Sequence, residues 1–301
     1  MVLDETVFET AVGVDLGGSK LLIRYRDRWL RCATGRGFGG AELTAQLLRF
    51  LDEQAQSATA LGIAVPGLVE DGVRVAACDV LPSLAGWDLR ASLGARVAAL
   101  ALVNDAKAAL HATTAGLSPG AVAVTVMAGT AIGCGIVAGA GVLGGASGWA
   151  GELGYWPMLR ADGRWTRLDE IAGGGAMEAH LGIGGQELAK RAAAGDEAVL
   201  KVIAEGGQAL GGALAGVVNL LNPRHLAVGG GALRLPGYWK QAQAVLRAQA
   251  IAPMLAACEV HAVHAIEDLV ARGAAGVALA LRSRTDPPGA AFLTAGRRCS
   301  G

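Results

Sequence analysis

Two short segments, GVDLGGSK at residues 13–20 and VNDA at residues 103–106, decide the fold of this chain. The first is an apolar run that breaks into a glycine turn carrying a hydroxyl and a cation. Such turns lay backbone N–H groups against phosphate oxygens. The second, about ninety positions later, ends another apolar run and presents the Asp105 carboxylate at a strand terminus. Together they predict a phosphate-binding loop facing a single acidic base, which is typical of phosphoryl transfer.

The composition is that of a globular enzyme. The 301 residues are 52% hydrophobic and 17% charged, which suffices for two α/β domains. Lys plus Arg and Asp plus Glu number 26 each, without a basic stripe, so no nucleic-acid partner is expected. Five widely spaced cysteines make neither a disulfide framework nor a metal ribbon, and they indicate a reducing cytoplasm. The first eleven residues show no signal peptide.

Residues 108–151 carry no Asp, Glu, Lys or Arg, and this stretch is long enough to span a membrane. Glycine is frequent in it, however, and each glycine disfavours a helix by roughly 1 kcal/mol relative to alanine. The stretch also lacks a basic flank. We therefore predict a buried glycine-rich hairpin at residues 121–137 and no membrane partner.

Hydrophobic periodicity gives a coarse map of the chain. A polar break at residues 116–120, GLSPG, is the expected domain boundary. A strand, a hydroxyl-bearing glycine turn and a strand occur in each half, and neither a Walker motif nor a dinucleotide-binding GxGxxG is present. Strands are expected at 11–31, 61–65, 121–137 and 226–228, and helices at 41–56, 89–99, 170–181, 185–193, 197–221 and 268–283.

Six motifs, in this order, resemble the ROK family of bacterial sugar kinases and sugar-responsive repressors. They are DLGGSK (15–20), AVPG (64–67), VNDA (103–106), GTAIG (129–133), GWAGELG (148–154), and NP with GGG (222–223 and 229–231). The resemblance runs from about residue 11 to residue 283. It implies an α/β, two-domain actin-like (ribonuclease H-like) ATPase fold with an interdomain cleft. Residues 1–116 would form the first domain and 117–267 the second, with helix 268–283 packing back on the first and a loose tail from 285 to 301.

The resemblance also implies ATP and Mg²⁺ as cofactors, with Asp15 near Mg²⁺-ATP. The glycine turn could instead be a plain β-hairpin turn without a phosphate-binding role. Lys20 could instead be a solvated charge. Ala131 stands where the family usually has glycine, and its methyl group limits the approach of the backbone. The ATP-binding residues implied are Gly17, Gly18, Ser19, Lys20, Gly129, Thr130, Gly229, Gly230 and Gly231.

Asp105 is the predicted catalytic residue. In the family this aspartate takes the proton from the sugar hydroxyl that attacks the γ-phosphorus, and such a base contributes roughly 10²–10⁴-fold. The alternative is a helix cap, because residues 106–111 look helical. We expect Asn104 to cap that helix while Asp105 faces the cleft.

The resemblance places the sugar against Gly67, Asn104, Asp105 and Glu152. The nearest charged residue before Glu152 in the sequence is Lys107, so this carboxylate needs a partner. Sugar hydroxyls are one such partner, and an ion pair with Arg160 or Arg164 is the alternative. Asp169 aligns with a second acid that contacts the sugar in the family. Glu170 beside it could occupy that position instead.

Two sugar-site positions depart from the family. Ser83 stands where asparagine is usual; serine is shorter, so its contact with the sugar would be weakened or mediated by water. Tyr155 stands where histidine is usual, and an inward-facing tyrosine would crowd an N-acyl group at C2 of the sugar.

The family's zinc cluster is missing. Residues 155–169 contain no Cys or His, whereas zinc needs about four ligands at close quarters. No zinc is therefore expected; a ligand set containing His180, His261 or His264 is the alternative.

These residues predict a cytoplasmic ATP- and Mg²⁺-dependent kinase of a hexose, most simply glucose. An N-acetylglucosamine or N-acetylmannosamine kinase is one alternative, and a degenerate family member that binds without turnover is another. A repressor is disfavoured because only about a dozen residues precede Asp15, too few for a DNA-binding domain. Family members are often dimers, so a homodimer is also implied.

Overall fold

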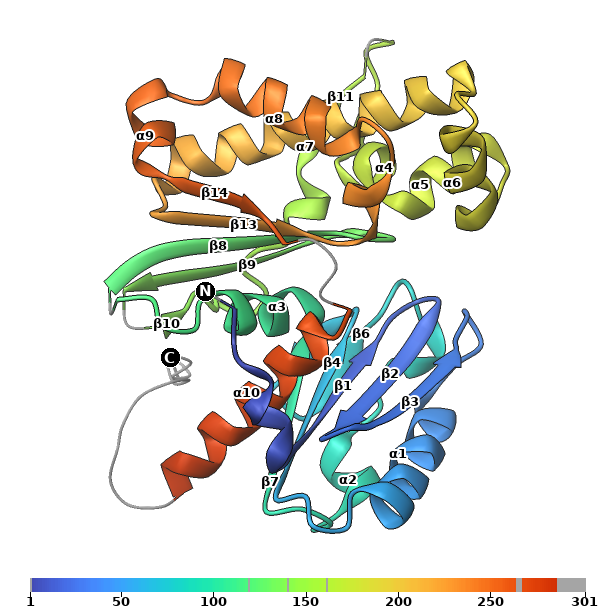
Figure 1. Cartoon of the computed structure of the whole chain (residues 1–301), viewed down its shortest axis with the longest axis vertical. Coiled ribbons are helices and arrows are strands. Elements are labelled where there is room, and N and C mark those ends of the chain that lie inside the picture. Colours follow the sequence, from blue (N-terminus) through green and yellow to red (C-terminus); the bar gives the residue numbers. More distant parts are fainter. Residues whose placement is uncertain (1, 119, 140, 161, 264–266, 286–301) are drawn as a thin grey trace, which may run out of the picture. The chain divides into compact units, whose positions relative to one another are not determined.

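The structure, a computed structural model, describes residues 2–118, 120–139, 141–160, 162–263 and 267–285 (Figure 1). They group into two compact units. Unit 1 comprises residues 1–120, 137–150 and 266–301, and unit 2 comprises residues 121–136 and 151–265. The sequence instead suggested a single boundary after residue 116. Residues 137–150 group with unit 1, where Lys107 Nζ donates a hydrogen bond to the carbonyl of Gly148.

Unit 1 is built on a five-stranded sheet of order β3-β2-β1-β4-β7. Its first three strands in sequence are antiparallel, whereas β1, β4 and β7 are parallel. β4 is buried along its whole length, as expected for a strand covered on both faces. The strands are β1 (Ala11–Leu16), β2 (Lys20–Tyr25), β3 (Arg28–Ala33), β4 (Ala60–Val65) and β7 (Ala99–Asn104).

Helices and short hairpins complete unit 1. The helix expected at residues 89–99 ends at Leu93, because Gly94 adopts a positive φ of 58° and caps it. The other elements are η1 (Glu5–Glu9), α1 (Gly40–Gln54), β5 (Leu68–Glu70), β6 (Arg74–Ala77), η2 (Pro82–Leu84), α2 (Leu89–Leu93), α3 (Asp105–Thr113), β10 (Gly141–Val142) and α10 (Leu269–Thr285). The predicted tail from residue 286 onward lies outside the described residues.

Helix α10 packs directly on the sheet of unit 1 and on α3 (Figure 1). Glycines make this contact possible: a Cβ atom at Gly13 or Gly62 would overlap the α10 backbone, and one at Gly273 would overlap the carbonyl of Ala108. A buried ion-pair cluster fixes the start of the helix, where Arg24 of β2 pairs with Asp268. Asp268 also pairs with Arg272 at 2.8 Å, so α10 is held by both close packing and charge.

Unit 2 contributes β8 (Gly120–Ala128), most of β9 (Ile132–Gly139), β13 (His225–Gly229) and β14 (Glu259–Ala262) to a second sheet, of order β10-β9-β8-β13-β14. β8, β13 and β14 are parallel. The expected glycine-rich hairpin at residues 121–137 is confirmed as β8 and β9. No helix in the described ranges is both long and apolar enough to cross a membrane.

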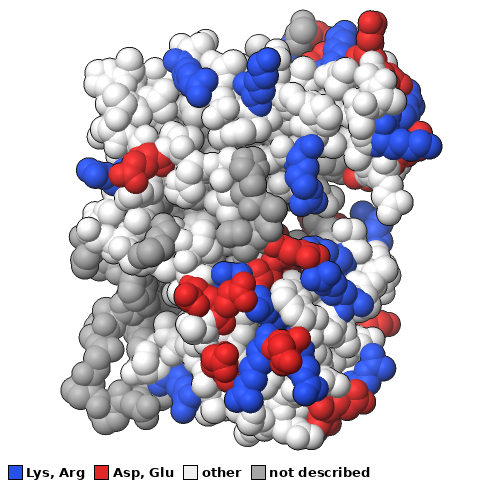
Figure 2. Space-filling model, in the orientation of Figure 1, with Lys and Arg blue, Asp and Glu red and all other residues white. Residues whose placement is uncertain are grey.

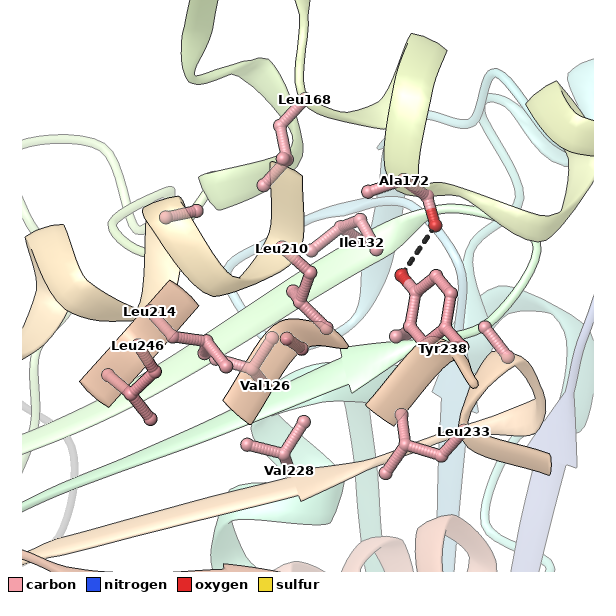
Figure 3. Packing of buried hydrophobic residues seen from close by; sticks show 14 of the residues in the cluster. Val126, Ile132, Leu168, Ala172, Leu210, Leu214, Val228, Leu233, Tyr238 and Leu246 are labelled. Carbon is pink, nitrogen blue, oxygen red and sulfur yellow. Dashed lines mark hydrogen bonds between the residues drawn. The ribbon is translucent and has the colours of Figure 1, made fainter. Parts of the chain in front are cut away.

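The long helix α7 organises the core of unit 2. Asp196 caps its first turn, and its buried face meets the sheet through Leu210 and Leu214 (Figure 3). Tyr238 is fully buried in this core and donates a hydrogen bond to the carbonyl of Ala172 at 2.6 Å (Figure 3). The helical and hairpin elements are η3 (Leu153–Tyr155), β11 (Pro157–Leu159), β12 (Trp165–Arg167), α4 (Asp169–Ala172), α5 (Gly174–Leu181), α6 (Gly185–Ala193), α7 (Glu197–Leu221), η4 (Gly231–Arg234), α8 (Tyr238–Gln249) and α9 (Ala252–Ala257).

Charged side chains of both signs are interspersed on the face drawn in Figure 2. Among the described residues on that face, no broad area carries one sign alone. This agrees with the equal numbers of acidic and basic residues in the sequence.

Candidate active site

The parallel strands of unit 1 end at one edge of the sheet, and their loops carry the predicted residues. Asp15 of β1 lies beside Ala64 of β4, and Ala64 lies beside Val103 of β7. The loops that follow these strands are therefore neighbours, as is usual for ligand sites in open α/β sheets. This edge brings together the glycine turn after Asp15, the Pro66–Gly67 turn, and Asp105.

Asp15 is a buried carboxylate with a cation nearby. Its side chain is only 14% exposed, and Lys20 Nζ lies 4.0 Å from Oδ2. Burial raises the pKa of Asp15 to about 6, while the charge of Lys20 lowers it. A partly desolvated carboxylate beside the predicted phosphate loop would suit Mg²⁺, which takes oxygen ligands and keeps several waters. Lys20 is half-exposed, so it is both a partner of Asp15 and a solvated charge.

The glycine turn joins β1 to β2 as a tight hairpin. Gly17 N–H donates to the carbonyl of Lys20 at 2.8 Å, and Thr34 Oγ1 donates to the carbonyl of Gly17 at 2.7 Å. A Cβ atom at Gly18 would overlap the side chain of Val80. Ser19, the last residue of this turn, is exposed. These contacts show the hairpin of the alternative, and the phosphate-binding role of the turn stays a prediction.

Asn104 and Asp105, at the start of α3, make different sets of hydrogen bonds. Asn104 Oδ1 accepts from Ala106 N–H at 2.9 Å, which confirms it as the helix cap, and its Nδ2 donates to the carbonyl of Gly67 at 3.1 Å. Asp105 Oδ1 also accepts from Ala106 N–H, at 2.7 Å. The positive end of the helix dipole stabilises the ionised carboxylate there.

Cys78 is a supporting residue that the sequence did not single out. Its buried thiol donates to the carbonyl of Pro66 at 3.2 Å and accepts from Leu81 N–H at 3.3 Å. It thereby connects the turn of Gly67 to η2, which carries Ser83. Ser83 is exposed and also lines an open pocket of about 590 Å³ beside α1.

In unit 2, Glu152 follows a position that only glycine can occupy. Gly151 has a φ of +99°, and a Cβ atom there would overlap the carbonyl of Cys134. Burial and the neighbouring charge of Glu152 raise the pKa of Cys134 to about 12. The alternative partners of Glu152 make other contacts: Arg160 donates to the carbonyl of Glu170, and Arg164 pairs with Asp162.

The two adjacent acids at the start of α4 differ in surroundings. Glu170 is exposed and pairs with Arg167 at 3.2 Å. Asp169 is partly buried and accepts from Ile132 N–H at 2.5 Å. Asp169, and not Glu170, therefore lies on the side of the GWAGELG segment.

Tyr155 makes a contact that the sequence did not suggest. Its side chain is half-exposed, and the guanidinium of Arg167 stacks over the ring, 4.6 Å from its centroid. The expectation that this ring faces the sugar stays a prediction.

The predicted second phosphate loop, Gly129–Ala131, is held by a glycine triplet that the sequence analysis missed. Gly174 N–H donates to the carbonyl of Gly129 at 2.8 Å, and Gly175 N–H donates to the carbonyl of Thr130 at 3.0 Å. A Cβ atom at Gly173 would lie 2.7 Å from that same carbonyl. Three consecutive glycines at the start of a helix were the available signal.

The glycine run at residues 229–231 meets the same loop from β13. Gly229 pairs with Met127 in the sheet, and Gly230, with a φ of +104°, is so close to Ala128 that a Cβ atom would overlap it. Gly231 begins η4. All the nucleotide-side residues predicted in unit 2 therefore lie together at the ends of β8 and β13.

Within the described part of the chain, no group of three or more His, Cys, Asp or Glu residues could hold a metal ion. The expectation that the protein carries no zinc stays a prediction. His264, one of the alternative ligands, lies outside the described residues.

The paired α/β units define the class of protein: a two-domain, actin-like ATPase fold. The model of the ROK family matches residues 11–281, so the chain belongs to the ROK family. A search of curated protein sequences found no match.

Solved structures share the fold over most of the chain. A ROK hexokinase from Thermus thermophilus is 25% identical with a TM-score of 0.69, over 91% of this chain and 99% of that one. A ROK glucokinase from Streptomyces griseus, solved with glucose and AMPPNP, is 22% identical with a TM-score of 0.72, over 90% and 99%. A ROK transcriptional regulator, homologous to the Escherichia coli MLC protein, is 20% identical with a TM-score of 0.70, over 90% and 78%.

Proposed function

We propose that the protein is an ATP-dependent sugar kinase that phosphorylates a hexose hydroxyl, with glucose as the preferred substrate. One observation carries the proposal: Asp105 opens α3 at the same sheet edge as Asp15 and the glycine turn that follows it. The proposed base and the proposed phosphate loop are thus carried by the same sheet of unit 1. The hexokinase and glucokinase neighbours support the same reaction.

In this mechanism Asp105 accepts the proton of the attacking sugar hydroxyl at a carboxylate oxygen. Mg²⁺, when bound with ATP, neutralises charge on the transferring phosphate, and Asp15 is the residue that would hold it. Backbone N–H groups at Gly18 and Ser19 would orient the phosphates, and the bond from Gly17 N–H to the carbonyl of Lys20 holds the turn that presents them. In unit 2, the loop at Gly129 and Thr130 and the run at residues 229–231 are the proposed ATP-binding residues.

Polar groups in each unit are proposed to contact the hydroxyls of the sugar. Asn104 and the backbone at Gly67 are joined by a hydrogen bond and would act together. Ser83 lies on η2 of the same unit. Glu152, Tyr155 and Asp169 are the corresponding assignments in unit 2.

A coupled assay of ADP release against glucose, mannose, N-acetylglucosamine and N-acetylmannosamine tests this proposal. We expect glucose to exceed both N-acetyl sugars by more than ~10-fold in kcat/KM, because a site rejects a clashing group strongly. Faster turnover of an N-acetyl sugar would contradict the choice of glucose, and turnover of no sugar would contradict kinase activity altogether.

In the same assay, Asp105→Asn should lower kcat by at least ~100-fold, since only proton acceptance is lost. The exposed Asp27→Asn is the matched control and should leave kcat unchanged. Turnover of Asp105→Asn within a few-fold of wild type would rule out the proposed base.

A further inference from the structure

Arg234 is an exposed cation shortly after the glycine run at residues 229–231, which the proposed function assigns to ATP. It is the last residue of η4, the short helix that begins at Gly231. Its Nη2 atom lies 3.4 Å from the point that a Cβ atom at Gly231 would occupy. Beyond the chain neighbours of Gly231, no other side chain of the described residues comes within 4 Å of that point. The guanidinium therefore lies over a glycine surface that is otherwise open.

The guanidinium of Arg234 makes no hydrogen bond or ion pair within the part of the chain that the structure describes. Other arginines of unit 2 are held by carboxylates, such as Arg167 by Glu170 and Arg191 by Asp196. A guanidinium is planar and always charged, and it carries five N–H donors. At Arg234 the charge, the donors and the flat face are therefore all available to a bound ligand.

The short helix η4 holds the backbone of Arg234 in a fixed place. Ala232 and Leu233 are buried, and Leu233 belongs to the core of unit 2 (Figure 3). Leu233 N–H donates to the carbonyl of Gly230 at 3.3 Å, and Leu235 N–H donates to the carbonyl of Ala232 at 3.0 Å. An arginine on this support can turn its side chain to a ligand without moving the glycine run.

The order of strands in unit 2 indicates which part of a nucleotide would reach Arg234. The predicted phosphate loop at Gly129 and Thr130 joins β8 to β9, whereas η4 follows β13, the strand on the other side of β8. Neighbouring strands are about 4.8 Å apart. The backbone at Gly230 packs against Ala128, directly before the loop. A nucleotide whose terminal phosphates lie at the loop would therefore extend past Gly230, with its base toward η4.

We infer that Arg234 binds the base of the nucleotide, with its planar guanidinium stacked on the face of the purine ring. This inference deepens the proposed function and rests on it for the presence of a nucleotide. That function gives the phosphates backbone N–H groups and Mg²⁺, but it assigns no residue to the base. Arginine suits this role, because its guanidinium is more weakly hydrated than an ammonium group and stacks on aromatic faces.

Three variants separate stacking on the base from attraction to the phosphates. Arg234→Ala removes both the charge and the flat face. Arg234→Lys keeps the charge without the flat face, and Arg234→Tyr keeps a flat face without the charge. Arg247→Ala is the matched control, because Arg247 is an exposed arginine of α8 that makes no hydrogen bond or ion pair with any other described residue.

The first measurement is calorimetric titration of the nonhydrolysable nucleotide AMPPNP with Mg²⁺, in the absence of sugar. We expect Arg234→Ala to weaken binding by about tenfold, as for the loss of a partly desolvated cation–π contact. Arg247→Ala should bind like wild type. Arg234→Tyr should stay within about threefold of wild type, because an aromatic ring also stacks on a base, and it should bind more tightly than Arg234→Lys.

Two results of this titration would overturn the inference. The first is unchanged affinity in Arg234→Ala, or no binding of AMPPNP by the wild type. The second is an affinity of Arg234→Lys that equals or exceeds that of Arg234→Tyr, because the contact would then be to the charge of the phosphates. Each variant should keep the Tm of the wild type, since residue 234 is exposed and the buried residues of η4 are unchanged.

Failure of the proposed function gives a separate result. If the variants bind AMPPNP in the expected order but no hexose is phosphorylated, then the base contact stands and the reaction is wrong. If hexoses are phosphorylated, Arg234→Ala should raise KM for ATP by about tenfold and leave kcat within about twofold, because a contact with the base is equal in the ground and transition states. An unchanged KM for ATP in that variant would leave the function in place and overturn the inference.

Discussion

Asp15 lies in β1 and Asp105 begins the helix that follows β7; both strands are parallel neighbours of β4, but the surroundings of the two carboxylates differ. Asp15 is shielded from water and its pKa rises to about 6. Asp105 is the first residue of α3, and its Oδ1 accepts from Ala106 N–H. Two carboxylates can therefore serve one site in different roles, Asp15 as the cation-holding group and Asp105 as the proton acceptor.

The raised pKa of Asp15 gives a pH prediction. Because the folded state binds this proton more tightly than the unfolded chain, the contribution of Asp15 to stability is complete below about pH 4 and is lost as pH rises through about 6. Asp15→Asn should therefore raise Tm at pH 8 and have little effect at pH 4. It should also abolish the Mg²⁺ dependence of nucleotide binding.

Thermal melts of both proteins from pH 4 to pH 8, without magnesium, check this prediction. Asp27→Asn serves as the control, because that side chain is 87% exposed. A Tm difference between wild type and Asp15→Asn that does not change with pH would show that burial does not shift this carboxyl group.

Among the elements, α7 shows how small residues set the distance between helices. Gly207 and Gly211 face α8, and a Cβ atom on either would overlap the α8 backbone at Tyr238 or Ala242. Gly212, the next residue, has no heavy atom within 4 Å of such a Cβ position. Packing against α8 therefore requires glycine at Gly211, whereas no contact requires it at Gly212.

Exchanging each of these glycines for alanine should separate the two situations. Gly212→Ala should stabilise the protein by about 0.5–1 kcal/mol, because alanine favours the helix and meets nothing. Gly211→Ala should destabilise it by about 1–3 kcal/mol through overpacking. Urea unfolding followed by circular dichroism measures both. The prediction is contradicted if the two variants shift stability in the same direction.

On the scale of the whole molecule, periodic elements and glycine turns were predictable, whereas contacts between distant segments were not. Strands β1 and β7, which carry Asp15 and lead into Asp105, follow from apolar runs with clear stops. Cys78 and the triplet at residues 173–175 matter only because the fold brings them against Pro66 and Gly129. The stacking of Arg167 on Tyr155 likewise depends on a short hairpin without strong periodicity.

The whole chain should also fold without zinc. Structural zinc contributes directly to folding, so its removal would lower Tm. We expect no stoichiometric zinc by elemental analysis of the purified protein, and a Tm unchanged by a chelator. Excess Mg²⁺ after chelation should restore full kinase activity. One equivalent of zinc per chain would show that a ligand set has been missed.

The packing of α10 on the first sheet has a consequence for biosynthesis. Strands β1 and β4 are made early, but the helix that covers Gly13 and Gly62 leaves the ribosome only after all of unit 2. Unit 2 is complete in sequence before unit 1 is. During translation the first sheet must therefore wait with one apolar face uncovered, where nascent chains are prone to aggregate and chaperones bind. A chain cut short before residue 269 would keep that face exposed for good.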